Sequence, residues 1–317
     1  MGKGISLAFS LAGYNVSLID SEPREKTGFQ ELRDTILVEA KVELSALRDL
    51  SLLNVDELES VLHRIDILPF EEAGLRIQQA DFVFEAVVEV MDVKKSVYEW
   101  LNKNLKPGAI VSSTTSTMSA NELACFLKHD TPFINAHWLN PAFLIPLVEV
   151  SPADATEISK VEELKSLLED IGKVTVLCKA SPGFIVARIQ AVALNEAARI
   201  VEDGVASAED VDKAIKTGFG IRYATQGLLE FIDFGGGDVL YHATSYLGSK
   251  LGEARFSVPP IIRKNMENNK NGIRDGAGFY NWEGIDTEAY KAEKMSEFIR
   301  LLQHRNLVPR IEGEKIE

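Results

Sequence analysis

The sequence has few cysteines and too few basic residues to balance its acids. Only Cys125 and Cys178 occur among 317 residues, too few for a disulfide framework or a cysteine-rich metal site, so we expect no metal and a reducing, cytoplasmic location. Lys and Arg number 34 against 48 Asp and Glu, which gives a formal net charge of -14. This charge repels nucleic-acid phosphates and anionic lipid headgroups, so we expect neither as a partner.

The sequence also lacks a long apolar run. No segment approaches the roughly 18 consecutive apolar residues of a membrane-spanning helix. Met1–Ser6 fits a loose myristoylation pattern, and Ile5–Ala12 is similar to the short core of a secretion signal. Polar Ser10 interrupts that core and no small-x-small cleavage site follows it, so we interpret both segments as part of the folded protein.

What the sequence does contain is a regular alternation of strand-like and helix-like segments. An apolar content of 45% is enough to bury a large core. Ile5–Gly13 has the spacing of an amphipathic helix, and Tyr14–Asp20 is typical of a short buried strand. The further predicted strands are 65–68, 81–86, 109–112, 133–137, 147–150 and 174–178, and the further predicted helical segments are 30–63, 93–104, 121–127 and 161–171.

This alternation predicts the fold class. Strands separated by helices of about ten residues or more form βαβ units, so we expect an α/β fold with a Rossmann-type doubly wound, mostly parallel sheet over residues 1–181. The alternation stops at Ala180–Gly183, and a helix over Phe184–Asp203 opens a region that is helical almost throughout. We therefore expect an all-helical domain over residues 182–285, followed by a helical tail over residues 286–317.

Two glycines stand directly before the first predicted helix. Gly2 and Gly4 occupy the place where a dinucleotide-binding turn brings backbone N–H groups and a positive helix end to a pyrophosphate. Asp20 closes the next strand, where a carboxylate can bind the adenosine ribose and repel a 2′-phosphate. These residues predict NAD rather than NADP as the cofactor. The alternative is an ordinary turn and a capping or solvated aspartate.

The strand that should precede this turn is not in the sequence. The chain starts inside its own G-x-G-x-x-G motif, so we expect the doubly wound sheet to have a truncated first strand. A start upstream of Met1 is our hypothesis. The alternative is a protein that lacks a central strand, binds the cofactor poorly and leaves neighbouring strand edges unpaired.

Polar side chains gather at the ends of predicted strands, at the edge where α/β sheets bind ligands. Residues 113–124 follow one strand, and residues 136–150 span the end of another and the start of the next. Alcohol oxidation needs a base for the hydroxyl proton, and His137 suits this role because an imidazole exchanges protons near neutral pH. Glu149 can hold that imidazole in one tautomer. The alternative is a packed histidine without a catalytic role. The neutral donors available to a substrate oxygen are Ser116 and Asn140.

These segments resemble the L-3-hydroxyacyl-CoA dehydrogenases, whose motifs are M-G-x-G-I, S-N-T-S-S-L-S-I-T-E-L-A, H-F-x-N-P and L-V-E-V. The resemblance covers about residues 1–282 and includes three further segments. It implies an NAD-dependent oxidoreductase of fatty acid metabolism that acts on a small molecule. The further segments are Phe84–Glu89 followed by Lys94, Ser181–Val186, and Gly276–Tyr280.

The resemblance also implies a role for each matching residue. His137 becomes the catalytic acid/base, Glu149 its orienting carboxylate, and Ser116 and Asn140 the donors to the substrate. An alternative for Glu89 and Lys94 is a solvated pair at the start of a helix. The helical domain of a family member would form a homodimer and close over the substrate. The implied cofactor contacts are Gly2, Gly4, Asp20, Glu89, Lys94 and Thr114.

Some residues depart from the family pattern. Thr114 and Ala187 each stand where the family motif has asparagine, and the second of these asparagines lies at the active site of family members. Arg222 lies in a segment similar to carnitine and L-gulonate dehydrogenases, where it can bind a substrate carboxylate. The alternatives are that it pairs with Glu230 or Asp233, or that it caps a helix.

We therefore keep two substrate classes, of which a short-chain (S)-3-hydroxyacyl-CoA such as 3-hydroxybutyryl-CoA is favoured over a free 3-hydroxy acid. An inactive structural homologue, like the relatives recruited as lens proteins, is the non-enzyme alternative.

Overall fold

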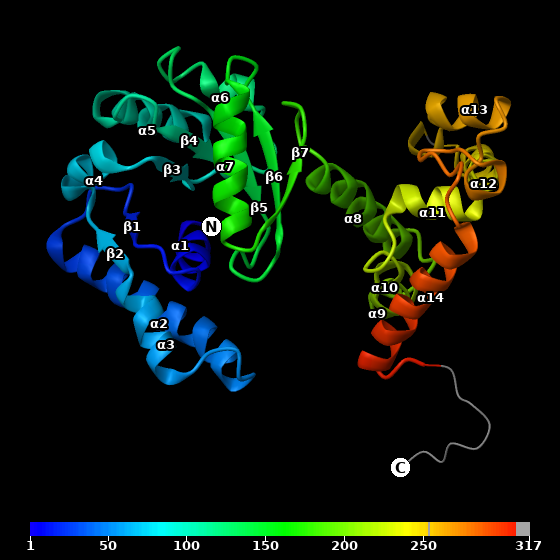
Figure 1. Cartoon of the computed structure of the whole chain (residues 1–317), viewed down its shortest axis with the longest axis horizontal. Coiled ribbons are helices and arrows are strands. Elements are labelled where there is room, and N and C mark those ends of the chain that lie inside the picture. Colours follow the sequence, from blue (N-terminus) through cyan, green and yellow to red (C-terminus); the bar gives the residue numbers. More distant parts are fainter. Residues whose placement is uncertain (253, 309–317) are drawn as a thin grey trace. The chain divides into compact units, whose positions relative to one another are not determined.

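The computed structural model describes residues 1–252 and 254–308. The chain divides into two compact units, Met1–Leu194 and Asn195–Glu317, which we call unit 1 and unit 2 and describe separately (Figure 1). Within the described ranges, all β-strands lie in unit 1 and unit 2 is helical. The predicted α/β domain followed by a helical domain is thus confirmed, whereas a domain boundary near residue 182 stays a prediction.

Unit 1 alternates strands and helices along the chain. Its strands are β1 (Val16–Ile19), β2 (Ile65–Leu68), β3 (Phe82–Glu85), β4 (Ile110–Ser113), β5 (Ile134–Trp138), β6 (Leu147–Pro152) and β7 (Val174–Leu177). Its helices are α1 (Gly2–Leu11), α2 (Lys26–Asp49), α3 (Val55–His63), α4 (Ala73–Gln79), α5 (Met91–Asn104), α6 (Ala120–Ala124), α7 (Ile158–Asp170) and the first part of α8 (Val186–Glu202), with a 3-10 turn at Phe70–Glu72.

The long helical segment predicted over residues 30–63 is two helices. Leu50–Asn54 separates α2 from α3, and Ser51 there has a left-handed φ of 60°, which a continuing helix does not allow. Asn54 and Glu57 then form a capping box at the start of α3. The charge pattern and the helix propensity of this segment do not indicate a break, so the prediction from the sequence missed it. The first helix also begins earlier than predicted, at Gly2.

The strands pair mostly in parallel. β1 pairs with β2, β3 with β4, and β6 with β7, all in parallel, and a parallel bridge from Val111 to Phe133 joins β4 to β5. The pair β5–β6 is antiparallel. Its connection, Leu139–Pro146, is too short for the crossover that a parallel pair requires, so this departure from a parallel sheet has a simple geometric cause.

β1 and β3 belong to separate hydrogen-bonded pairs. They line one cavity of about 970 Å³, together with parts of α1, β2 and α5. In the doubly wound strand order 3-2-1-4-5-6, β2 and β1 take positions 3 and 2, and β3 and β4 take positions 4 and 5. The cavity therefore lies between positions 2 and 4 of this order, beside α1.

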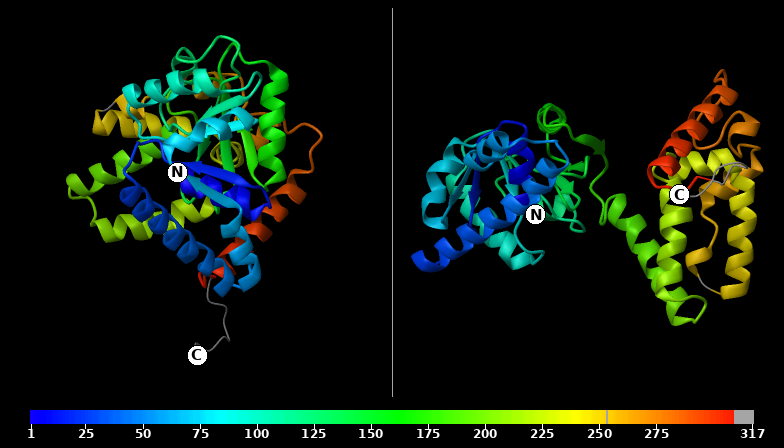
Figure 2. Two further views of the ribbon diagram at one scale, coloured as in Figure 1. Left: turned by 90° about the vertical axis from the view of Figure 1, so that its left-hand side faces the viewer. Right: turned by 90° about the horizontal axis from the view of Figure 1, so that it is seen from below.

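Helices cover both faces of the strands in unit 1, which Figure 2 shows from two further directions. On one face α1 and α7 pack against β4, β5 and β6, with Leu164 and Leu168 of α7 fully buried. On the other face α5 and α6 contribute Tyr98 and Leu123, which are fully buried too. Each large apolar side chain buried in this way contributes roughly 1.5–3 kcal/mol. The strands that carry the polar motifs thus lie in the best-packed part of the unit.

Unit 2 consists of the remainder of α8 and of further helices, with a longer connection between the last two. A buried aspartate, Asp233, organises one side of it by accepting hydrogen bonds from the backbone of Phe279 and Tyr280 and from the indole of Trp282. The helices are α9 (Ala208–Ala214), α10 (Gly220–Arg222), α11 (Leu228–Gly235), α12 (Gly237–Leu251), α13 (Pro260–Glu267) and α14 (Thr287–His304), with a π turn at Ile215–Phe219 and 3-10 turns at Ala254–Phe256 and Ile273–Asp275.

The predicted helical tail over residues 286–317 corresponds to α14 as far as His304, and its residues 309–317 lie outside the described ranges. Over residues 1–252 and 254–308, every helix is too short or too polar to span a lipid bilayer.

Candidate active site

The pairing of β5 with β6 places one histidine opposite one glutamate. The register sets His137 against Glu149, and directly opposed side chains in a sheet lie on the same face. His137 Nδ1 and Glu149 Oε2 are 2.6 Å apart, and the two side chains are 4% and 1% exposed. A carboxylate at this distance accepts from Nδ1–H, which leaves Nε2 of the neutral imidazole as an acceptor.

Ser116 lies on the other side of the imidazole. It belongs to the loop that follows β4, and its Oγ is 3.1 Å from His137 Nε2. Ser116 is half-buried, whereas the imidazole and Glu149 are buried. The structure thus brings together three of the four predicted catalytic residues in a line of hydrogen bonds that runs from the core to a more exposed hydroxyl.

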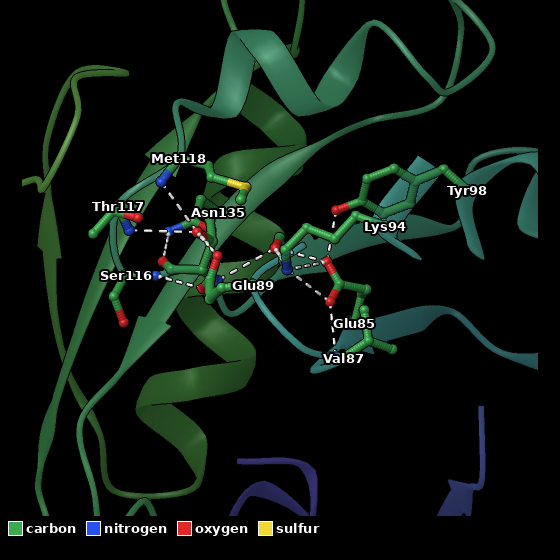
Figure 3. A network of polar contacts seen from close by, with 11 residues as sticks. Glu85, Val87, Glu89, Lys94, Tyr98, Ser116, Thr117, Met118 and Asn135 are labelled. Carbon is green, nitrogen blue, oxygen red and sulfur yellow. Dashed lines mark hydrogen bonds and ion pairs between the residues drawn. The ribbon is translucent and has the colours of Figure 1, made fainter. Parts of the chain in front are cut away.

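Glu89 supports the loop that carries Ser116 (Figure 3). Its carboxylate accepts from Thr115 Oγ1 at 2.8 Å and from the backbone N–H of Ser116 at 3.1 Å. Thr115 Oγ1 also accepts from the amide of Met118 at 3.1 Å, and Asn135 Nδ2 donates to the Thr115 carbonyl at 3.2 Å. Glu89, which was predicted to contact the cofactor, therefore holds the serine beside His137 in this structure.

Lys94 is completely buried beside a different glutamate. Its Nζ lies 2.9 Å from Glu85 Oε1, and both side chains are 1% exposed (Figure 3). The hydroxyls of Tyr98 and Ser113 also donate to Glu85, at 2.7 and 2.8 Å. Burial raises the pKa of the Tyr98 hydroxyl, and the charge of Glu85 raises it further. The alternative of a solvated Glu89–Lys94 pair is wrong, because Lys94 is buried and pairs with Glu85; its contact with the cofactor stays a prediction.

The second oxygen of Glu149 has partners that sequence reasoning missed. Glu149 Oε1 accepts from the backbone N–H groups of Ile185 and Val186, at 2.9 and 3.0 Å. The ring of Phe184 lies 5.8 Å from the imidazole of His137, between centroids. The only signal in the sequence is the Ser-Pro-Gly turn before α8, which predicts where a helix begins but not which side chain its first amides contact.

Family models match both parts of the chain. The model described as 3-hydroxyacyl-CoA dehydrogenase, NAD binding domain, matches residues 1–181, and the model of the C-terminal domain of the same enzymes matches residues 183–282. The chain belongs to the 3-hydroxyacyl-CoA dehydrogenase family. It is accordingly an oxidoreductase, and its cofactor is NAD.

Individual relatives are similar over most of their length. A 3-hydroxybutyryl-CoA dehydrogenase of Bradyrhizobium diazoefficiens is 31% identical over 287 residues, which cover 90% of this chain and 92% of that protein. A 5-formyl-3-hydroxy-2-methylpyridine 4-carboxylate 5-dehydrogenase of Mesorhizobium japonicum is 29% identical over 239 residues, or 74% of this chain and 77% of that one. The crystal structure of a 3-hydroxyacyl-CoA dehydrogenase from Archaeoglobus fulgidus matches with a TM-score of 0.74 at 28% identity, covering 97% of this chain and 96% of that one.

For a 3-hydroxyacyl-CoA dehydrogenase, the start of α1 fits the pyrophosphate of NAD. The first turn of α1 contains no acidic residue, so the amides there and the positive end of the helix dipole can face an anion. Gly2 lines the cavity between β1 and β3. A Cβ atom on Gly4 would come within 3.1 Å of the Ala142 Cβ, so glycine permits the close packing of α1 here.

Asp20 directly follows β1 and lines the same cavity. Its carboxylate accepts from the backbone N–H of Glu22 at 3.1 Å and from Arg24 Nε at 2.7 Å. The hydrogen bond that Arg24 donates to Asp20 raises the pKa of the Arg24 guanidinium. Asp20 thus stabilises a turn and pairs with Arg24, while the N-cap of α2 is Glu25. The ribose contact stays a prediction, and a bound ribose would share the carboxylate with Arg24.

Asn140, the fourth predicted catalytic residue of this family member, lies apart from the line. It is exposed, two residues after β5, and within the described ranges no hydrogen bond joins its side chain to Ser116. The loop beyond it is held by Lys173, whose Nζ donates to the carbonyls of Ala142 and Ile145 at 2.7 and 2.9 Å. Burial lowers the pKa of Lys173.

The structure also locates two residues where the chain departs from the family pattern. Thr114 directly follows β4 and is 8% exposed. Arg222 belongs to unit 2, is exposed, and has its guanidinium 4.9 Å from the centre of the Phe231 ring. In the described part of the chain Arg222 forms no ion pair with either predicted carboxylate, and Asp233 instead binds the segment 279–282.

Proposed function

We propose that the protein oxidises the 3-hydroxyl of a short-chain (S)-3-hydroxyacyl-CoA, of the size of 3-hydroxybutyryl-CoA, to the 3-ketoacyl-CoA. The observation that carries this proposal is the hydrogen-bonded line of Ser116, His137 and Glu149. In this line a carboxylate fixes one nitrogen of the histidine and a hydroxyl faces the other, and this geometry suits a general base. Relatives named 3-hydroxybutyryl-CoA dehydrogenase, at 30–31% identity, support the choice of substrate.

In this mechanism His137 moves the proton. The substrate hydroxyl binds where it can reach both His137 Nε2 and Ser116 Oγ, and Nε2 accepts the hydroxyl proton as the C–H bond breaks. Glu149 stabilises the imidazolium that forms and keeps the ring oriented. NAD, when bound, supplies the acceptor for the hydride. In the reverse direction the imidazolium returns its proton to the oxygen of the 3-keto group, and Asn140 is the further donor proposed for the substrate.

A second candidate is the oxidation of a free 3-hydroxy acid. Arg222 is an exposed cation that forms no ion pair in the described ranges, and a guanidinium binds a carboxylate in a bidentate manner. The name of the Mesorhizobium japonicum relative describes a pyridine carboxylate that carries a 5-formyl group, so it supports the free carboxylate of this candidate and not the choice of a 3-hydroxyl. The two candidates differ in whether substrate recognition needs Arg222.

Turnover at the NADH absorbance band tests both candidates. We expect NADH consumption with acetoacetyl-CoA, loss of that activity in His137→Gln, and little change in Arg222→Ala. Turnover of free hydroxy acids that requires Arg222, with none of the thioester, would replace the first candidate by the second. An absence of NAD binding and of turnover with every substrate would support the inactive structural homologue instead.

We also propose that unit 2 forms a homodimer. Large apolar side chains on its helices are exposed, including Leu229 at 45%, Val239 at 58% and Tyr246 at 63%, and exposed apolar surface of this kind supports association. Sedimentation velocity should give the mass of a dimer, and a monomer at every concentration would contradict the proposal. A cytoplasmic location, a role in fatty acid metabolism and a domain boundary near residue 182 belong to the same proposal.

A further inference from the structure

The Glu149 carboxylate is a bridge between the catalytic histidine and the start of a helix. One oxygen faces His137 Nδ1 at 2.6 Å, and the other accepts the N–H groups of Ile185 and Val186 at 2.9 and 3.0 Å. The side chain is 1% exposed, so these contacts are made away from bulk water. Hydrogen bonds between N–H groups and a buried carboxylate are stronger and more directional than those between neutral partners.

The two amides belong to the beginning of α8. The first helical residue is Val186, and the first four N–H groups of a helix have no carbonyl partner within the helix. Glu149, which comes from β6, therefore takes the place of a local capping side chain. The positive end of the helix dipole lies at the same point and favours a carboxylate there.

The backbone conformation just before α8 directs these amides toward Glu149. Gly183 and Phe184 both have left-handed backbones, with φ of 71° and 42°. A left-handed conformation is costly for a phenylalanine and persists where the surroundings hold it. Phe184 is 4% exposed and its ring is tilted by 32° against the imidazole of His137, so the same residue forms the turn and covers the catalytic ring.

We propose that the backbone amides of Ile185 and Val186 are positioning groups for His137. They anchor Glu149 Oε1, so that Oε2 stays within hydrogen-bond distance of Nδ1 and Nε2 stays directed at Ser116. If this anchor is lost, the carboxylate can rotate away, and the imidazole then loses its fixed tautomer and orientation. The inference rests on the proposed acid/base role of His137.

Proline at position 186 tests one anchor directly. Val186→Pro removes a single N–H at the first position of a helix, where proline fits best. Val186→Ala removes the side chain and keeps the N–H, so the difference between these two variants isolates the amide. Ile158→Pro places proline at the equivalent position of α7, at a residue that is 74% exposed, and controls for the effect of proline on a helix start.

We expect kcat of Val186→Pro to be about tenfold below that of Val186→Ala, with similar KM values, because the lost contact is a hydrogen bond to a charged group that positions a base. Ile158→Pro should retain full activity. Equal kcat in the two position-186 variants would overturn the proposal, and melting curves identify a variant that is unfolded.

A second measurement does not depend on turnover. The proton on His137 Nδ1 should give a strongly downfield NMR signal, assigned by its disappearance in His137→Gln. We expect this signal to shift or broaden in Val186→Pro and to persist in Val186→Ala. An unchanged signal in Val186→Pro would contradict the anchoring, whereas an altered signal in a protein with no dehydrogenase activity would support the anchoring and refute the proposed function.

Discussion

At the scale of single residues, the chemistry depends on which atom of a side chain faces which neighbour. His137 has a carboxylate on Nδ1 and a hydroxyl on Nε2, so its two nitrogens take different roles. Lys94 and Glu89 show the opposite case, since the family resemblance implied a cofactor contact for each of them but did not predict their partners within the chain. Lys94 pairs with Glu85, and Glu89 holds the loop of Ser116.

His137→Gln should remove the proton-transfer step while keeping the size of the side chain. We expect kcat to fall by about 10²–10⁴, the usual contribution of a general acid or base. NAD binding should be nearly unchanged, because the proposed contact of His137 is with the substrate hydroxyl and not with NAD. Steady-state kinetics together with calorimetric titration of NAD measure both effects, and a variant with full kcat would show that His137 is only a packed histidine.

Lys94→Met should destabilise unit 1 by about 3 kcal/mol, because removing one partner of a buried ion pair leaves the Glu85 charge uncompensated. Urea unfolding followed by circular dichroism measures the loss. Lys95→Met is the matched control, since the neighbouring Lys95 is 51% exposed and its pair with Glu99 spans 4.0 Å. Similar losses of unfolding free energy in both variants would mean that the buried pair stabilises the protein no more than the exposed one.

At the scale of elements, buried polar side chains join segments that are distant in sequence. In unit 1, Glu149 of β6 meets the start of α8. In unit 2, Asp233 of α11 binds the segment 279–282 through three N–H groups. Gly278 is needed beside it, because a Cβ there would lie 2.2 Å from Asp233 Oδ1.

Asp233→Asn should therefore lower the free energy of unfolding of unit 2 by about 2–3 kcal/mol, because the new amide group faces N–H donors and leaves at least one of them without an acceptor. Thermal unfolding measured by calorimetry tests this. The control is Asp212→Asn, whose side chain is 72% exposed and should change the melting temperature little. Equal melting temperatures of the two variants would show that the hydrogen bonds to Asp233 do not stabilise unit 2.

At the scale of the whole molecule, the cofactor residues and the predicted base all belong to unit 1. Gly2, Asp20 and the cavity of about 970 Å³ lie along α1, β1 and β3, whereas His137 and Glu149 lie on β5 and β6. Cofactor binding should thus be visible as stabilisation of the unit that also carries the catalytic line.

NAD should raise the melting temperature of the protein, by an amount that corresponds to about 2.7 kcal/mol when its concentration is a hundred times Kd. Asp20→Ala should reduce this shift at a given NAD concentration, because it removes the proposed ribose acceptor, while kcat at saturating NAD changes little. Differential scanning fluorimetry with Asp49→Ala as an exposed control measures the difference. An undiminished shift in Asp20→Ala would leave the side chain with its contacts to Glu22 and Arg24 alone.

The sequence by itself determined the alternation of strands and helices in unit 1 and the types of residue at the active site, whereas α4 and the break between α2 and α3 were not predicted. Hydrophobic period, turn residues and segment length are local properties, so strands such as β2 and β7 could be predicted within one residue of their bounds. The catalytic line could be predicted as well, because His137 and Glu149 stand at the ends of neighbouring strand segments whose pairing brings them together.

Only the tertiary structure decided which partners the buried polar groups have. The Lys94–Glu85 pair and the two amides on Glu149 Oε1 each depend on residues brought together by packing rather than by sequence spacing. A buried charge must find a counterion or hydrogen bonds wherever the fold offers them, so its partner is a property of the packed chain and not of the motif that contains it.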